Sequence, residues 1–229
     1  MKEDITSLEE CMFTYLETQL AHKDFFDAID QSVLNHYPKQ AIPVLSMGSG
    51  TDSGVIAASL WSQDLDFKLI CFQANEDLSI LNKRIQILDK DTFTVEPQSK
   101  DNLEQIYNEM ESIGYKKGEG TGIGAGLVHF MLSKYITSPF MFSGLGTDEL
   151  YTGDITLLFR FLKRAHMSYD WFEVDVQYPL LTTEVYKEYL RLDPELRSDY
   201  KQPFREYMKF KNFPIDYKKR SFSYFADSS

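Results

Sequence analysis

The sequence has little cysteine and little histidine. Only Cys11 and Cys71 occur among the 229 residues, far apart and outside any Cys-x-x-Cys pair, so no disulfide framework is indicated. Cys71 stands in the apolar run FKLICF, and we expect it to be buried in a strand. The four histidines show neither HxxxH nor HExxH spacing and are interpreted as structural or surface residues.

The sequence also lacks a long apolar run. No segment approaches the length of a membrane span. The first ten residues, MKEDITSLEE, are acidic and polar and do not resemble a signal peptide. We therefore expect a cytoplasmic protein with no membrane partner.

Positive charge is scarce as well. The chain has 24 Lys and Arg against 35 Asp and Glu, a formal net charge of −11, so we expect no nucleic-acid partner. The segment 201–220 is the exception, because it carries seven basic residues and two acidic ones. It is either a solvated face or a cationic patch that faces an anionic ligand.

Short apolar runs alternate with amphipathic segments, which predicts a doubly wound parallel α/β sheet of about five strands with a helical C-terminal extension. Ligands bind such sheets at the carboxyl ends of the strands, near the switch point of the strand order. The pattern predicts strands at 41–46, 67–72, 91–97 and 138–144, and helices at 6–35, 53–62, 78–88, 102–114 and 127–136. We expect three regions: N-terminal helices packed on the core (1–40), the α/β core (41–155) and a helical part that completes the active site (156–229).

The first candidate site is the loop SMGSGTDSG (46–54), which follows an apolar run and leads into a helix. Glycine-rich backbone at a helix N-terminus presents amide N–H groups to an anion. The loop is not a Walker A motif, because no Gly-Lys-Ser/Thr closes it, and Ser53 breaks the dinucleotide pattern G-x-G-x-x-G. A structural turn is the alternative. Asp52 would suit a magnesium ion beside bound phosphate.

A second loop repeats the pattern. The segment FMFSGLGTDELYTGD (140–154) again runs from a strand through Ser-Gly to acidic residues, Asp148 and Glu149, at a helix start. These acids could merely compensate the helix dipole. Taken together, the two loops are better explained if one cradles phosphate and the other supplies a second carboxylate to the same metal.

The chain resembles the synthetase domain of B-type asparagine synthetases, which are N-type ATP pyrophosphatases with an HUP-like (adenine nucleotide alpha hydrolase-like) fold. The family motif Ser-Gly-Gly-x-Asp-Ser-Ser is matched by GSGTDSGVIAA (48–58), and Ser-Gly-Glu-Gly-x-Asp-Glu-Leu by SGLGTDEL (143–150). The family's Arg-x-Pro-Phe-Leu-Asp and Lys-x-x-Phe segments are matched by QYPLLT (177–182) and KRSF (219–222). The resemblance spans residues 24–222.

The resemblance implies an ATP- and magnesium-dependent ligase. Such an enzyme adenylates a carboxylate, releases pyrophosphate, and lets ammonia or another amine form the amide as AMP leaves. By motif, the implied magnesium ligands are Asp52 and Asp148, and the implied catalytic residues are Asp148, Glu149 and Lys219. The implied ATP-binding set comprises Leu45, Ser46, Gly48, Ser49, Gly50, Thr51, Asp52, Ser53, Phe72, Gln73, Ser143 and Gly144.

The chain departs from the family in several places. Leu145 replaces the glutamate expected as base for the amine. Either another residue is the base, with Glu149 as the adjacent carboxylate and Tyr151 or Tyr178 as candidates by residue type, or the amine arrives neutral, or the second half-reaction differs. Gly54 replaces the last serine of the first motif, and Gln177 and Thr182 replace the Arg and Asp around the proline. The chain begins Met-Lys, without the Cys at position 2 that a glutaminase domain needs, so free ammonia, an amine of the substrate or a separate glutaminase subunit would supply the nitrogen.

The sequence leaves two other functions open. The protein could bind a nucleotide without catalysis, as a subunit or sensor. It could also be a different adenylating enzyme of the same superfamily that acts on a nucleobase or tRNA, although its acidity disfavours RNA.

Overall fold

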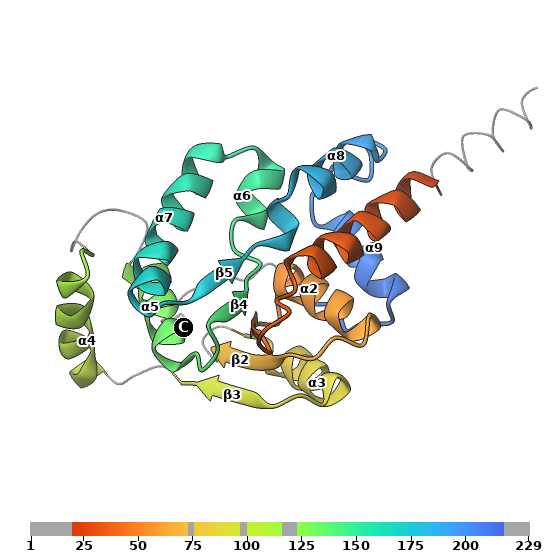
Figure 1. Cartoon of the computed structure of the whole chain (residues 1–229). Helices are drawn as coiled ribbons and strands as arrows, with labels where there is room; N and C mark the ends of the chain where they lie inside the picture. Colours follow the sequence, from red (N-terminus) through yellow and green to blue (C-terminus); the bar gives the residue numbers. More distant parts are fainter. Residues whose placement is uncertain (1–19, 73–75, 97–99, 116–122, 218–229) are drawn as a thin grey trace, which may run out of the picture.

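The computed structural model describes residues 20–72, 76–96, 100–115 and 123–217 (Figure 1). A helix over 20–36 opens this part of the chain. The strands are β1 (Val44–Met47), β2 (Lys68–Phe72), β3 (Thr92–Val95), β4 (Phe140–Phe142) and β5 (Asp175–Gln177). The other helices are α2 (Thr51–Ser62), α3 (Leu78–Leu88), α4 (Lys100–Ser112), α5 (Ile123–Tyr135), α6 (Thr147–Thr152), α7 (Ile155–Trp171), the 3-10 helix η1 (Pro179–Leu181), α8 (Thr183–Arg191) and α9 (Gln202–Phe210).

The strands form one parallel sheet in the order β3-β2-β1-β4-β5. Along the chain, β2 and β3 are added in turn on one side of β1. The chain then crosses to the other side of β1, where β4 and β5 follow. The switch point therefore lies between β1 and β4, which are paired with Leu45 opposite Phe142. This arrangement confirms the predicted doubly wound α/β class.

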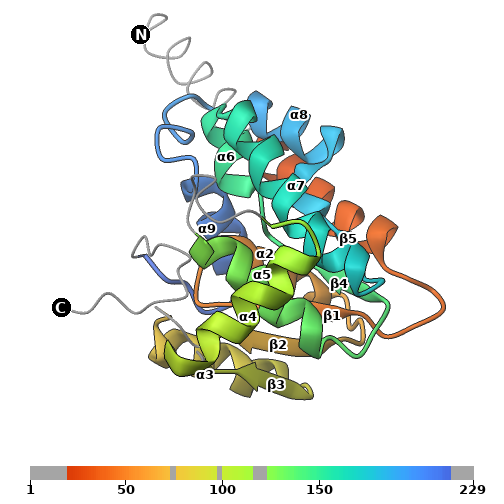
Figure 2. The ribbon, with the colours of Figure 1, turned by 90° about the vertical axis from the view of Figure 1, so that its left-hand side faces the viewer.

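Successive residues of the strands serve two separate cores, because side chains alternate across a sheet. In β1 and β2, Leu45, Leu69 and Cys71 face a core shared with the 20–36 helix, α2, α3, α8 and α9. Val44 and Ile70 face a second core with α4 and α5. Figure 2 shows α4 and α5 in front of the strands.

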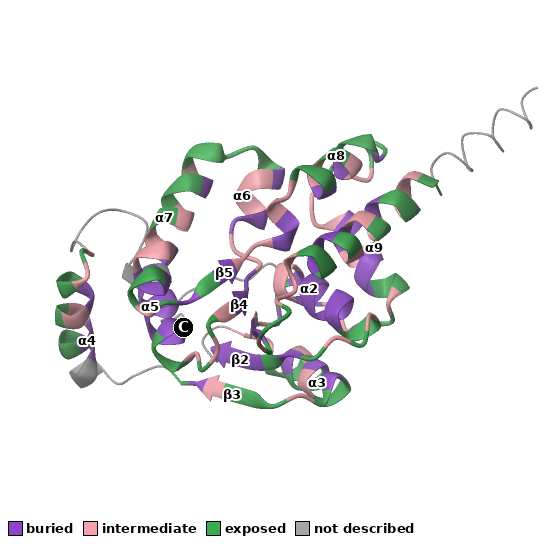
Figure 3. Ribbon diagram, in the orientation of Figure 1, coloured by how far each residue is buried: buried purple, intermediate pink, exposed green. Residues whose placement is uncertain are grey.

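Helix α2 starts directly after the first small-residue loop and is buried along most of its length (Figure 3). Its residues Val55–Ala58 are fully buried, because the helix lies between the sheet and α9. A helix that is covered on both sides needs apolar residues around its whole surface, which is why VIAASL shows no polar stripe.

The sequence-based assignment missed two features. Strand β5 lies within 156–229, a region predicted to be helical; it has three residues, and its outer ones are Asp175 and Gln177. Helix α5 begins at Ile123, four residues before the predicted start at 127. In the described part of the chain no helix combines the length and the apolar character needed to cross a membrane.

Candidate functional site

Two loops touch each other at the switch point. The first, Gly48–Gly50, joins β1 to α2, and the second, Ser143–Gly146, joins β4 to α6. A Cβ atom built on Gly144 would lie 2.8 Å from the Cβ of Asp52 and 2.9 Å from the backbone N of Ser53. Only glycine therefore allows the second loop to approach the start of α2 this closely.

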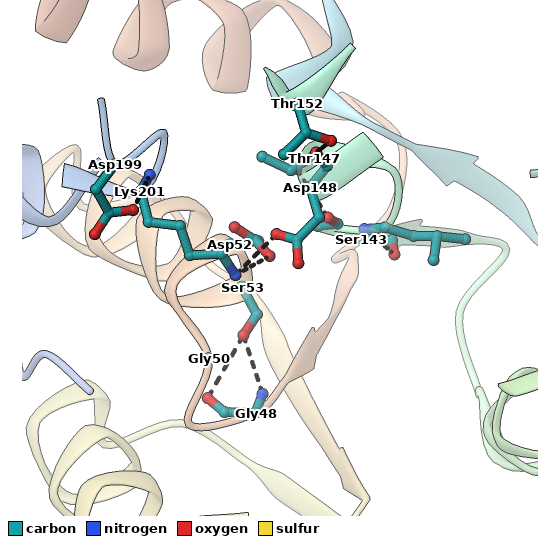
Figure 4. A network of polar contacts seen from close by, with 12 residues as sticks. Gly48, Gly50, Asp52, Ser53, Ser143, Thr147, Asp148, Thr152, Asp199 and Lys201 are labelled. Carbon is teal, nitrogen blue, oxygen red and sulfur yellow. Dashed lines mark hydrogen bonds and ion pairs between the residues drawn. The ribbon is translucent and has the colours of Figure 1, made fainter. Parts of the chain in front are cut away.

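The contact brings two carboxylates and one ammonium together. The Lys201 Nζ lies 3.3 Å from the Asp52 Oδ2 and 2.8 Å from the Asp148 Oδ1 (Figure 4). Asp52 is in the first turn of α2, Asp148 in the first turn of α6, and Lys201 is the N-cap residue of α9. Three segments that are distant in sequence thus meet at one charged cluster, which we call the Asp52–Asp148–Lys201 cluster.

Burial and mutual attraction set the protonation of this cluster. Burial raises the pKa of Asp52 to about 7, and the Asp148 charge adds to that effect while Lys201 opposes it. Burial also acts to raise the pKa of Asp148, but Lys201 outweighs it and holds that pKa below its usual value. Burial alone would lower the pKa of Lys201, but the two carboxylates raise it above its usual value. Lys201 is therefore charged at neutral pH, with Asp148 as the ionised partner.

The cluster fits a magnesium ion that is shared with phosphate. The Asp52 Oδ1 is buried without a hydrogen-bond partner in the described structure, so one carboxylate oxygen is left for a cation. The described residues hold no group of three His, Cys, Asp or Glu able to enclose a metal. Magnesium needs only one or two carboxylates when substrate phosphates supply further oxygens. The residues thus suit an ion that arrives with a nucleotide.

The first loop presents backbone donors beside this cluster. Gly50 is the N-cap of α2 and has no side chain to cap the helix, which leaves the first amides of α2 for an anion. The Ser53 hydroxyl accepts a hydrogen bond from the Gly48 N–H at 3.1 Å and stabilises the turn. Loop and helix together have the form of an anion site.

Other residues of the predicted ATP-binding set lie nearby with different exposures. Ser49, Thr51 and Ser143 are buried, and Ser46 is half-buried on β1. The side chains of Leu45 and Phe72 lie in the two apolar cores, so their backbone atoms are the groups that a ligand at the sheet edge can reach. Gln73 and Lys219 lie outside the described residues, so their predicted roles stay predictions.

The candidate bases differ in character. Glu149 follows Asp148 on α6, and burial together with the Asp148 charge raises its pKa. Tyr151 is buried and donates its hydroxyl to the Leu180 carbonyl at 2.9 Å. Burial also raises the pKa values of Tyr151 and Tyr178, which disfavours their ionisation. Leu145 is partly buried against an apolar cluster.

Sequence reasoning missed three residues around the loops. Lys201 stands out in the sequence only as part of the basic segment 201–220, and its contact with Asp52 spans 149 positions. Arg84 and Glu76 contact the first loop but were not singled out. Arg84 had a detectable signal, because it shares the buried face of α3 with Leu81 and Leu88.

The fold and site define a class of protein: a parallel α/β protein with a glycine-rich loop and two neighbouring carboxylates at its switch point. No protein-family model and no curated protein matches the sequence. Among solved structures, the chain is similar to NMN synthetase from Francisella tularensis, with 14% identity over 85% of this chain and 92% of that chain. The TM-score is 0.40, and the similarity at this level assigns no function.

Proposed function

We propose that the protein is a stand-alone, asparagine-synthetase-like amide ligase that uses ATP and forms AMP and pyrophosphate. The observation that carries the proposal is the Asp52–Asp148–Lys201 cluster. In it, the aspartates of the two predicted motifs both pair with the Lys201 ammonium. Nothing in a purely structural turn requires two aspartates from separate strand ends to meet beside an uncapped helix N-terminus. A site for magnesium and triphosphate gives this pair a role, because magnesium binds one or two carboxylates together with phosphate oxygens.

In the proposed reaction, the loop 48–53 binds the β- and γ-phosphates through its backbone N–H and hydroxyl groups. Asp52 and Asp148 would hold magnesium, which neutralises charge on the pyrophosphate leaving group. A substrate carboxylate oxygen then bonds to the α-phosphorus as the bond to the β-phosphate oxygen breaks. Lys201, already paired with both carboxylates, turns its ammonium to the phosphate oxygens and stabilises their developing charge.

The second half-reaction forms the amide. The amine nitrogen bonds to the acyl carbon, the bond to AMP breaks, and the amine proton goes to a base. Glu149 is the proposed base, because its raised pKa makes it a better proton acceptor than an exposed glutamate. Lys219, by its motif, is proposed to stabilise the acyl-adenylate transition states.

The test is pyrophosphate release from ATP with pools of carboxylates and ammonium, followed by ATP–pyrophosphate exchange with each active acid. We expect exchange in the wild type and its loss in Asp148→Asn. Asp64→Asn, which removes an exposed carboxylate, is the matched control and should retain exchange. Exchange that persists in Asp148→Asn would refute the assignment.

A second candidate is a nucleotide-binding subunit or sensor without turnover. The observation that favours it is Leu145, which cannot accept a proton at the position of the family's glutamate. ATP binding without AMP or pyrophosphate formation, with every acid and amine tried, would support this candidate. Salt-sensitive RNA retention on a gel would favour the third, tRNA-directed alternative.

A further inference from the structure

A buried arginine lies beneath the first loop. Arg84 is fully buried on α3. Its Nη1 donates to the Gly48 and Gly50 carbonyls at 2.7 and 2.8 Å, and its Nε donates to the Pro214 carbonyl at 3.0 Å. One guanidinium thus ties two peptide groups of the loop to the segment after α9.

These hydrogen bonds fix the direction of two backbone N–H groups. A trans peptide is planar, so its N–H points away from its C=O. The Gly48 carbonyl shares a peptide with the Ser49 N–H, and the Gly50 carbonyl shares one with the Thr51 N–H. Because Arg84 holds both carbonyls, both N–H groups are directed to the opposite side of the loop.

The loop already holds an anion on that side. The Ser49 N–H donates to the Glu76 carboxylate, and the Asp77 N–H donates to the Ser49 hydroxyl at 3.0 Å. The Glu76 Oε1 lies 2.5 Å from the position that a Cβ on Gly48 would take, so the carboxylate packs directly against the loop backbone. Carboxylate and phosphate oxygens both accept hydrogen bonds from backbone N–H groups. Glu76 therefore occupies a place that suits a phosphate.

Gly54 makes room for the arginine. A Cβ on Gly54 would lie 2.7 Å from the Arg84 Nη2 and 2.6 Å from the Met208 Cε. The asparagine synthetase family that the chain resembles has serine at this position. Gly54 lacks that hydroxyl group, and the Arg84 guanidinium occupies the space. Burial lowers the pKa of Arg84 to about 10, while the charges of Glu76, Asp216 and Asp52 oppose that effect. The guanidinium stays charged at neutral pH.

We propose that Arg84 is a positioning residue that directs the loop's amides to an anion, and that the Glu76 carboxylate is an internal occupant that an incoming phosphate group displaces. This inference rests on the proposed function, in which the loop binds the phosphates of ATP. The Glu76 carboxylate and a phosphate would compete for the same Ser49 N–H, so removing the carboxylate should strengthen phosphate binding. Removing a side chain that only supports the loop would weaken phosphate binding instead.

The experiment measures the binding of inorganic pyrophosphate and of ATP, each with magnesium, by calorimetry. Glu76→Gln and Glu76→Ala should bind pyrophosphate at least about fivefold more tightly than the wild type. Glu104→Gln removes an exposed carboxylate from α4 and should change the affinity less than about twofold. Arg84→Met should weaken binding at least about tenfold in protein that remains folded.

A second measurement observes the Ser49 amide directly. The amide resonance of Ser49 in nitrogen-15 spectra should move in Glu76→Gln, and pyrophosphate should move it in the wild type. If the Glu76 variants bind pyrophosphate no more tightly than Glu104→Gln, the inference is wrong even where ATP turnover stands. Tightened pyrophosphate binding without turnover would support the inference and leave the ligase proposal refuted. An unchanged Ser49 resonance in Glu76→Gln would overturn the inference, and this test does not depend on whether Arg84→Met folds.

Discussion

Replacing Lys201 by methionine tests the Asp52–Asp148–Lys201 cluster through protein stability. At an effective dielectric constant of about 20, unit charges separated by 3.3 and 2.8 Å attract by roughly 5 and 6 kcal/mol. Desolvation of the three groups cancels much of this attraction. Removing one partner of a buried pair costs about 3–5 kcal/mol. Because Asp148 is one-third exposed, we expect a loss of about 3 kcal/mol.

The loss should depend on pH. Without Lys201 the two carboxylates face each other uncompensated, and Asp52, whose pKa is already about 7, takes up a proton more readily. Protonation relieves the repulsion, so Lys201→Met should be most destabilising at pH 8 and least at pH 5.

Urea unfolding at pH 5 and pH 8 measures both effects. Lys209→Met is the control on the same helix, because the Lys209 side chain is 70% exposed and its pair with Glu206 spans 3.7 Å. We expect the control to change the free energy of unfolding by less than about 0.5 kcal/mol at both pH values. Equal losses in the two variants, or a loss from Lys201→Met that does not vary with pH, would refute the reasoning.

Two further predictions concern the same loops. Gly144→Ala should lower the free energy of unfolding by about 1–3 kcal/mol, because its Cβ meets backbone atoms that cannot yield. Gly50→Ala, with a φ of −61° and no atom within 4 Å of the new Cβ, should leave the melting temperature unchanged in the same thermal scans, and a similar drop in both variants would be inconsistent with this packing. Asp52 has a raised folded-state pKa, so the folded state binds its proton more strongly and wild-type stability should fall as pH rises from about 4 to about 7. Asp52→Asn should flatten that fall in urea unfolding, and an unchanged slope would count against a buried, protonatable Asp52.

The sequence allowed the sheet and the meeting of the two loops to be predicted. Buried parallel strands leave apolar runs such as FKLICF, and their carboxyl ends share one edge of the sheet, so Asp52 and Asp148 were expected to be neighbours. Strand β5 could not be found in the same way. Its three residues form an edge with one buried position, Val176, which is too short for a periodic signal.

The third member of the cluster could not be predicted, for a different reason. Lys201 reaches Asp52 only because α9 packs on α2, and no local pattern encodes that contact. The charge of Arg84 on an apolar helix face was a usable clue, since buried arginine requires partners. Its partners, the carbonyls of Gly48 and Gly50, are backbone atoms and leave no trace in the sequence.

The central claim is that Asp52 and Asp148 serve one magnesium–nucleotide site. The most direct test is a double-mutant cycle of Asp52→Asn and Asp148→Asn, read out as the affinity for ATP with and without magnesium. We predict that each single variant loses most of the magnesium-dependent gain in affinity and that the double variant loses little more, because both residues act through the same ion. Additive losses, or single variants that keep the full magnesium dependence, would contradict the account.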